Sequence, residues 1–253
     1  MAATRKFVGI AIFVNLMFGS LLAHSEVHIE AKYKGRLVVG AWEHPWTEVL
    51  DEGLNASTLL AHEEKQIEKM CPGYTKFADK RRLFWQQLLI SLSWRESLHG
   101  PENWVEFNGG TNNGLYQINP VLRRAYDCEG YVLFDPHQNI TCAVKMAQKL
   151  VTRFGSFLVG KKGGMAAYWQ PLRATNANNR KNRKFILDHV TKACRTGELA
   201  YHQLAEFVPE GGFPDVDRSF NTIDDLGLTP EELGDANDVS GMNYLQPNFE
   251  VIW

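Results

Sequence analysis

The sequence predicts a mainly α-helical domain of the α+β class, with a minor β or turn segment and an extension at each end. Apolar residues recur at helical spacing most clearly in residues 83–99, which predicts an amphipathic helix there, and in residues 140–154 and 185–194. Between the first two stretches, residues 108–114 form a run of glycine and asparagine turn formers. The apolar fraction of 44% is sufficient for a globular core, so the chain as a whole is not expected to be disordered.

The N-terminus has the pattern of a secretory signal peptide, residues 1–25. Arg5 and Lys6 supply positive charge, residues 7–22 form an apolar run, and small residues precede a cut that we place after Ser25. An uncleaved membrane anchor is the alternative, although the apolar run is slightly short for a span. In either case we expect the protein to leave the cytoplasm and to be secreted or periplasmic.

The cysteine count fits an exported protein, because an even number of cysteines in an oxidising compartment indicates disulfide bonds. The four cysteines are Cys71, Cys128, Cys142 and Cys194. Of the three possible pairings we favour Cys128–Cys142, which are close in sequence, together with Cys71–Cys194 as a longer clasp. A zinc site is a poorer alternative, since the chain contains no Cys-x-x-Cys pair.

Charge divides the chain into two parts. Residues 26–195 carry 24 Lys and Arg against 17 Asp and Glu, whereas residues 196–253 carry 1 against 12. The acidic part is also rich in proline, and we predict a mostly irregular C-terminal extension with at most one short helix, near Thr229. This extension either wraps the basic part by charge complementarity or stays solvated, and the sequence leaves both interpretations open.

One carboxylate has a position that suits acid catalysis. Glu96 lies in the last turn of the helix predicted for residues 83–99, which the Gly100-Pro101 pair would end. A carboxylate there faces the negative end of the helix dipole, and we expect its apolar neighbours to desolvate it in part. Both effects favour the protonated acid. A carboxylic acid that keeps its proton can protonate the leaving oxygen of a glycosidic bond.

Four short motifs occur in order around this residue. They are Glu96-Ser97, Gly114-Leu115-Tyr116-Gln117-Ile118, Phe134-Asp135-Pro136 with Asn139-Ile140, and Ala166-Ala167-Tyr168-Trp169. At this spacing they resemble the soluble lytic transglycosylase and goose-type lysozyme (SLT domain) family, whose members cleave bacterial cell-wall glycan. The resemblance covers residues 83–171. It implies a lysozyme-like helical catalytic domain, placed at 73–195, with an N-terminal elaboration at 26–72 packed on its core and the acidic extension at 196–253.

Smaller elements complete the prediction. Residues 26–40 alternate loosely and are expected to be extended, and residues 42–72 suggest one or two helices. Residues 114–118 are expected to form a short strand-like piece that the preceding turn brings back against the end of the Glu96 helix. Residues 120–126 are expected to form a short helix.

The resemblance also implies a set of site residues. It makes Glu96 the catalytic residue and assigns substrate contacts to Ser97, Tyr116, Gln117, Ile118, Tyr168 and Trp169. The amide of Gln117 both donates and accepts, which suits the N-acetyl group of a sugar. Tyr168 would bring a phenol within hydrogen-bonding reach of Glu96. Tyr116 stands where the family has Met and Trp169 where it has Asn, and we expect their aromatic faces to stack on sugar rings.

The family's chemistry implies a single glutamate that acts twice on the β-1,4 bond between N-acetylmuramic acid and N-acetylglucosamine. Glu96 would protonate the glycosidic oxygen while the substrate's acetamido group stabilises the developing cation. It would then take a proton from the sugar's 6-hydroxyl, which closes a 1,6-anhydro ring, whereas goose-type lysozymes admit water instead. Most glycosidases use two carboxylates. Between Glu96 and Ile118 this chain offers only Glu102 and Glu106 as a second one.

Two hypotheses from different functional classes follow. The first is a monomeric, secreted enzyme that cleaves peptidoglycan glycan strands as a transglycosylase or a lysozyme (muramidase). A weak acidic excess beside the motif suggests a preference for de-N-acetylated glycan: Glu102, Glu106, Asp127 and Glu129 against Arg123 and Arg124. The second is a non-catalytic lysozyme-like module that binds wall glycan or a protein partner. For either we expect no cofactor, no metal, no nucleic-acid partner and no membrane span after signal cleavage.

Overall fold

The computed structural model describes residues 35–36, 39–107 and 110–201. The predicted signal peptide and the acidic extension from residue 202 onward lie outside the described residues, so both stay predictions. Within the described ranges, no helix combines the length and the apolar character that crossing a bilayer requires.

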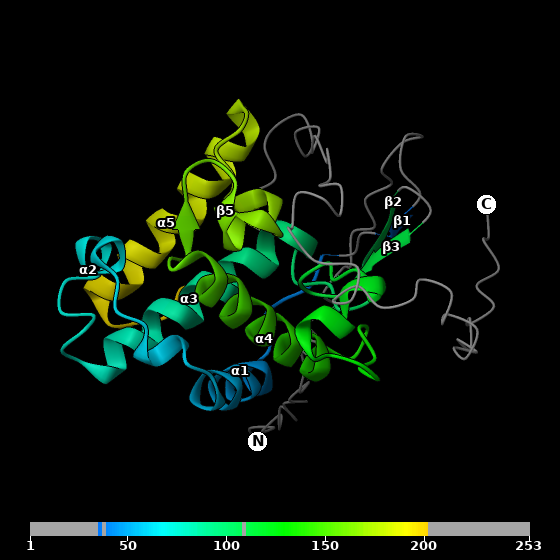
Figure 1. Ribbon diagram of the computed structural model, residues 1–253. Coiled ribbons are helices and arrows are strands. Elements are labelled where there is room, and N and C mark those ends of the chain that lie inside the picture. Colours follow the sequence, from blue (N-terminus) through cyan, green and yellow to red (C-terminus); the bar gives the residue numbers. More distant parts are fainter. Residues whose placement is uncertain (1–34, 37–38, 108–109, 202–253) are drawn as a thin grey trace, which may run out of the picture.

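The described chain is mainly helical, with two small antiparallel sheets (Figure 1). Its α-helices are α1 (His44–Ala56), α2 (Lys65–Met70), α3 (Ala78–Ser97), α4 (Pro136–Phe154) and α5 (Ala177–Thr196). Its 3₁₀ helices are η1 (Leu59–Ala61), η2 (Pro120–Leu122), η3 (Arg124–Tyr126), η4 (Met165–Ala167) and η5 (Gln170–Leu172). Its strands are β1 (Gly35–Arg36), β2 (Trp104–Phe107), β3 (Gly110–Asn113), β4 (Leu158–Val159) and β5 (Gly163–Gly164). The predicted fold class, mainly α with a minor β component, is confirmed.

Helix α3 is the centre of the fold. Every side chain from Phe84 to Trp94 is buried. The expectation of an amphipathic helix was therefore wrong, because α3 is enclosed on all sides. Its buried polar side chains are hydrogen-bonded, as such groups must be. The amide of Gln86 donates to a carboxylate of α1 at 2.7 Å, and the amide of Gln87 donates to Ser91 Oγ at 3.0 Å.

The other helices surround α3. Helix α5 packs along it, and α1 packs against both α4 and α3 (Figure 1). Trp46, Leu50 and Leu54 of α1 belong to the same hydrophobic core as Trp85 of α3. The indole of Trp85 also donates a hydrogen bond to the hydroxyl of Tyr74 at 2.6 Å. The segment before residue 73 thus contributes to the core that holds α3.

The larger sheet lies at one end of the helical body (Figure 1). Its central strand, β2, pairs antiparallel with β1 on one side and with β3 on the other. In this register Glu106 lies opposite Thr111, and Trp104 lies opposite Asn113. The smaller sheet is the β4–β5 hairpin.

Two predictions about this region were wrong. Residues 110–113, expected in a turn, form strand β3, because pairing with β2 outweighs the weak strand propensity of glycine and asparagine. Residues 114–118, expected to be strand-like, form a tight turn. Gly114 (φ 75°) and Gln117 (φ 49°) both have left-handed backbones, which an extended strand does not contain.

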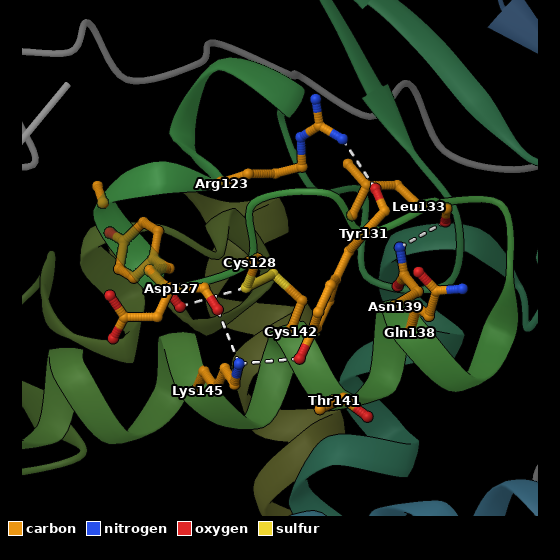
Figure 2. Close-up of a disulfide and its surroundings, with 12 residues drawn as sticks. Arg123, Asp127, Cys128, Tyr131, Leu133, Gln138, Asn139, Thr141, Cys142 and Lys145 are labelled. Carbon is orange, nitrogen blue, oxygen red and sulfur yellow. Dashed lines mark hydrogen bonds between the residues drawn. A yellow bond between two sulfur atoms is a disulfide. The ribbon is translucent and has the colours of Figure 1, made fainter. Parts of the chain in front are cut away.

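Both predicted disulfides are present. Cys71 pairs with Cys194 with a Cα–Cα distance of 5.3 Å, and Cys128 pairs with Cys142 at 5.6 Å. The first joins the end of α2 to the last turn of α5. The second joins the segment after η3 to α4 (Figure 2).

Candidate active site

Glu96 lies where the buried helix α3 reaches the surface. Its side chain is partly exposed, whereas Ser97 is buried. The guanidinium of Arg95 stacks on the ring of Phe185 in α5, with Cζ 4.0 Å from the ring centroid. Burial lowers the pKa of Arg95 to about 10, so the group remains charged at neutral pH. Glu96 therefore lies at the C-terminal end of a helix, where the helix dipole disfavours a negative charge.

The helix ends in a strained turn directly after this residue. Leu98 (φ 53°) and His99 (φ 58°) both adopt the left-handed backbone, which is uncommon for residues other than glycine. The ring of His99 is fully buried against Trp42 and Trp94, at centroid distances of 5.4 and 5.2 Å. The N–H of Gly40 donates to Leu98 O at 2.9 Å. The N-terminal segment thus holds the turn that positions Glu96.

The 114–118 turn is built on a position that accepts only glycine. A Cβ on Gly114 would lie 2.1 Å from Leu133 O and 2.4 Å from Asn139 Nδ2, and the backbone there is left-handed. The amide of Gln117 donates to Gly114 O at 2.9 Å and to Asn103 O at 3.0 Å. The side-chain oxygen of Gln117, Oε1, is buried and has no hydrogen-bond partner among the described residues.

Asn139 of α4 holds this turn in place by hydrogen bonds. It is fully buried, and its Oδ1 accepts from the N–H of Tyr116 at 3.0 Å. Its Nδ2 donates to Asn113 O at 3.1 Å and to Leu133 O at 2.7 Å; the bond to Leu133 appears in Figure 2. One side-chain amide therefore satisfies three backbone groups. This explains physically why an asparagine follows the Phe-Asp-Pro motif at this interval.

Two hydroxyl groups join the turn to the elements around it. Ser97 Oγ donates to Leu115 O at 2.8 Å, which fixes the turn to the end of α3. The hydroxyl of Tyr168 donates to Gln117 O at 3.1 Å and accepts from the N–H of Asn119 at 2.8 Å. Glu96, the 114–118 turn and Tyr168 are thereby brought together, as the sequence motifs suggested.

The hydroxyl of Tyr168 is used differently from what was expected. It bonds to the backbone on both sides of Ile118 rather than to Glu96. Burial raises the pKa of Tyr168; the hydrogen bond from Asn119 opposes this shift, and the nearby charge of Glu96 adds to it. Tyr168 therefore keeps its proton at neutral pH and can act as the donor that holds the turn.

Most of the other residues expected to contact substrate support the site from the core. The exposed fraction is 0% for Tyr116 and Ile118, and 1% for Ser97 and Trp169. The expectation that the rings of Tyr116 and Trp169 stack on a sugar is corrected accordingly, since neither has a free face. The indole of Trp169 instead donates to Tyr116 O at 3.2 Å. Larger side chains than the family pattern thus fill the space beneath the turn.

The two further carboxylates differ in their surroundings. Glu102 is exposed and forms an ion pair with Arg36 of β1 at 2.9 Å. Glu106 lies on β2, is half-buried and has no ion pair or hydrogen bond from its side chain within the described part of the chain. Among the described residues, Glu106 is therefore the carboxylate of the larger sheet whose charge is not compensated by a neighbour.

The region after the turn carries the second disulfide and a small cavity. Arg123 donates to Tyr131 O at 2.8 Å, and Lys145 donates to Asp127 O and to the hydroxyl of Tyr131 (Figure 2). A cavity of about 330 Å³ lies between η3 and α4, lined in part by Tyr126. The described residues contain no group of three or more His, Cys, Asp or Glu side chains that could hold a metal ion.

Sequence reasoning missed two supporting residues, His99 and Asn139, as parts of the site. Asn139 was contained in a recognised motif, but its role depends on backbone groups that are distant in sequence. His99 had no signal, because a left-handed backbone at a residue other than glycine cannot be read from residue type.

No family model and no curated protein sequence matches the chain. A comparison of structures finds Bd0314 DslA, a lysozyme-like protein of Bdellovibrio, as wild type and as two variants that each have one glutamate replaced by glutamine. These matches are 25–26% identical, have a TM-score of 0.50, and cover 57% of this chain and 86% of the DslA chain. The chain has a lysozyme-like fold.

Within this lysozyme-like fold, the likeness to DslA also indicates an enzyme of the glycosidase type. The paired disulfides fit an extracellular or periplasmic protein, because such bonds persist in oxidising compartments.

Proposed function

We propose that this protein is a secreted peptidoglycan-cleaving glycosidase of the lytic transglycosylase or goose-type lysozyme kind. It acts on the β-1,4 bond between N-acetylmuramic acid and N-acetylglucosamine, and Glu96 is the acid that protonates the leaving oxygen. The observation that carries the proposal is the position of Glu96, a partly exposed carboxylate at the end of a helix in which every residue from Phe84 to Trp94 is buried.

The surrounding geometry supports this role. Catalytic groups must be held firmly, because small displacements from the productive geometry cost rate. Here the turn after Glu96 is held by His99 and Gly40, and the facing 114–118 turn is held by Asn139 and Tyr168. Such extensive support for one carboxylate favours a catalytic site over a binding module that lost catalysis.

The test is cleavage of purified peptidoglycan by the chain from residue 26 and by Glu96→Gln, with products identified by mass spectrometry. Loss of a general acid lowers rate by about 10²- to 10⁴-fold, so the variant should release almost no product. Glu63→Gln, which changes an exposed glutamate between η1 and α2, is the matched control. Equal activity of Glu96→Gln and this control would refute the role of Glu96.

The mass of the products separates the two reaction types. Ends with a 1,6-anhydro ring identify a transglycosylase, and reducing ends, which are one water heavier, identify a lysozyme. For the hydrolytic outcome a second carboxylate must orient water. Glu106 is our candidate, because it is half-buried and has no charged partner among the described residues, while Glu102 is paired with Arg36.

The DslA structures add support for a second carboxylate. Their variants replace two different glutamates, which are 11 positions apart in DslA. Glu96 and Glu106 are separated by almost the same interval in this chain. We therefore expect Glu106→Gln to lose water-derived products. Retained anhydro products in this variant would show that a single glutamate suffices, whereas unchanged hydrolysis would exclude Glu106 as the second carboxylate.

The proposal extends to a preference for de-N-acetylated glycan, whose glucosamine units carry amines. Of the four acids beside the motif, three are paired: Glu102 with Arg36, Asp127 with Lys149, and Glu129 with Arg124. Within the described part of the chain, Glu106 is left to attract an amine. The protein should therefore cleave chemically de-N-acetylated wall faster than acetylated wall. The ratio of these two cleavage rates should be smaller in Glu106→Gln. Faster cleavage of fully acetylated wall would refute the preference.

A non-catalytic glycan-binding module is the second candidate, favoured by the burial of Tyr116 and Trp169 in place of smaller or polar family residues. Its signature would be retention on insoluble peptidoglycan without product from either wall type, equally in wild type and Glu96→Gln.

A further inference from the structure

The solvent-facing side of α5 is a cationic stripe. Five basic side chains are exposed there at helical spacing: Arg180, Lys181, Lys184, Lys192 and Arg195. The opposite side of the helix, with Ile186, Val190 and Cys194, is buried. The helix contains one acid, Asp188, which pairs with Lys184. The stripe therefore carries a large net positive charge on a single rigid element.

The stripe continues onto the β4–β5 hairpin. Arg183 Nη1 donates to Gly160 O at 3.1 Å, and Ala174 N donates to Lys161 O at 3.0 Å. These bonds hold the hairpin turn against the N-terminal part of α5. The side chain of Lys161 is exposed there. The cationic face thus extends over two elements that are fixed to each other.

The chain beyond α5 leaves from a defined point. The helix ends at Thr196 and is capped by Gly197, whose backbone is left-handed (φ 78°). Ala200 N then donates to Gln87 Oε1 at 2.7 Å, and Gln87 Nε2 donates to Ala200 O at 3.0 Å. Because Gln87 is fully buried in α3, this two-way hydrogen bond fixes the start of the following segment beside α5.

We propose that the acidic segment, residues 202–253, binds in cis along this cationic face. The segment carries 11 Asp and Glu against one Arg, and the face carries the opposite charge. A random coil of the same length, 52 residues, has a root-mean-square end-to-end distance of about 40 Å. Helix α5, with 20 residues at 1.5 Å each, is about 30 Å long. The segment can therefore span the whole stripe from its attachment at Ala200.

Covalent attachment decides between this occupant and an external polyanion. A tethered partner acts at an effective concentration on the order of millimolar, which a dilute external polymer does not reach. The segment should therefore shield the face, and an anionic polymer should gain access only when it displaces the segment. This inference does not depend on the proposed function, because it concerns binding and not cleavage.

The test is zero-length carbodiimide cross-linking of the intact chain, followed by peptide mass spectrometry. Lys181, Lys184 and Lys192 should be joined to acids of residues 202–253 at low salt. The cross-links should disappear at 1 M salt, where the screening length is about 3 Å. Lys65 and Lys76, which are exposed on other elements, serve as internal controls and should be joined rarely. Cross-links spread evenly over all exposed lysines, or none to the segment, would overturn the proposal.

Two further measurements exclude other occupants. Mixing isotope-labelled and unlabelled chains identifies cross-links between molecules; if these dominate, the face binds a second copy and the proposal fails. The second measurement is the salt concentration that elutes the chain from heparin. Neutralising the segment (Asp224→Asn, Asp225→Asn, Glu231→Gln, Glu232→Gln) should raise this salt concentration, because the cationic face is then no longer shielded.

A charge-matched pair of variants completes this heparin measurement. Added to the neutralised segment, Lys181→Ala with Lys184→Ala should reverse the stronger retention. Lys65→Ala with Lys76→Ala has the same net charge and should not. Two results would contradict shielding by the segment. The first is an equal effect of the two lysine pairs on the eluting salt concentration, and the second is an eluting salt concentration that does not change when the segment is neutralised.

Discussion

At the scale of single residues, the position of Glu96 depends on residues that are not adjacent to it in the sequence. The turn after it has two left-handed residues, and the turn opposite it needs a glycine with no room for a Cβ. The hydrogen bonds of Asn139 and Tyr168 secure these unusual backbones. The residues that matter most for the geometry around Glu96 therefore have buried amide and hydroxyl side chains, which take no part in the proposed reaction themselves.

Gly114→Ala tests this view. The new Cβ would clash with Leu133 O and the Asn139 amide in addition to adopting a left-handed backbone. Gly130 has nearly the same φ (76°) but nothing within 4 Å, so Gly130→Ala isolates the backbone cost of about 1 kcal/mol. Gly114→Ala should lose roughly 3 kcal/mol or more, because steric overlap is added.

Urea denaturation of both glycine variants measures these losses in the free energy of unfolding. Peptidoglycan cleavage measured below the transition should also fall in Gly114→Ala alone. Equal unfolding midpoints for Gly114→Ala and Gly130→Ala would show that the close approach to Asn139 is easily relieved.

Prediction from sequence placed Glu96, the proposed acid, at the end of its helix, but it did not identify Asn139 and His99 as supporting residues. Glu96 could be found because a carboxylate at the end of an apolar helix is visible in a one-dimensional pattern. Ser97, Tyr116 and Trp169 were assigned to substrate because motif membership does not distinguish a side chain that faces the cleft from one that faces the core. Their burial depends on how α3, α4 and η4 come together.

At the scale of elements, the helices were predicted well and the strands poorly. Helical periodicity is local, so α4 was recognised within four residues of its ends, whereas the predicted stretch 185–194 covered only the C-terminal half of α5 (Ala177–Thr196). Strand β3 was not recognised, because Gly110–Asn113 has turn-forming residues and becomes a strand only through its register with β2. Likewise, α3 was expected to have a polar face, since its hydrogen-bonded glutamines and serines look like solvated residues in the sequence.

The connection after α2 supplies a pH-dependent element. Glu68 accepts hydrogen bonds from the N–H groups of Gly73 at 2.7 Å and Thr75 at 3.2 Å, and these bonds lower the pKa of Glu68 below its usual value of 4.5. Its contribution to stability is therefore present above pH 4.5 and is lost as the pH falls through the lower pKa of the folded state.

Glu68→Gln should destabilise the protein at pH 7, and less so at a second pH that is low enough to protonate the wild-type carboxyl as well. The urea midpoints of wild type, Glu68→Gln and the exposed control Glu63→Gln at both pH values measure the difference. An identical loss at both pH values would mean that the charge of Glu68 does not matter for the turn.

At the scale of the whole molecule, the two disulfides act over very different lengths of chain. Cys128–Cys142 closes a loop of 14 residues, and Cys71–Cys194 closes one of 123. Both pairs were predicted correctly, since export and an even cysteine count leave few choices. The chain-entropy model assigns about 3 kcal/mol to the short loop and about 5 kcal/mol to the long one.

Replacing each pair by serines should therefore lower the free energy of unfolding more for Cys71 and Cys194 than for Cys128 and Cys142. Denaturation of the two double variants by guanidinium gives the comparison. The opposite order would show that local packing around α4, and not loop closure, governs the effect.

The longer disulfide also makes the molecule resistant to a single cut. Glu96, the 114–118 turn and Tyr168 all lie between Cys71 and Cys194, so the chain that carries the site is a covalent ring. A protease that cleaves one surface loop inside this ring opens it but releases no fragment. The nicked protein should migrate as one species without reductant and as two with it, and its site should stay assembled among foreign proteases.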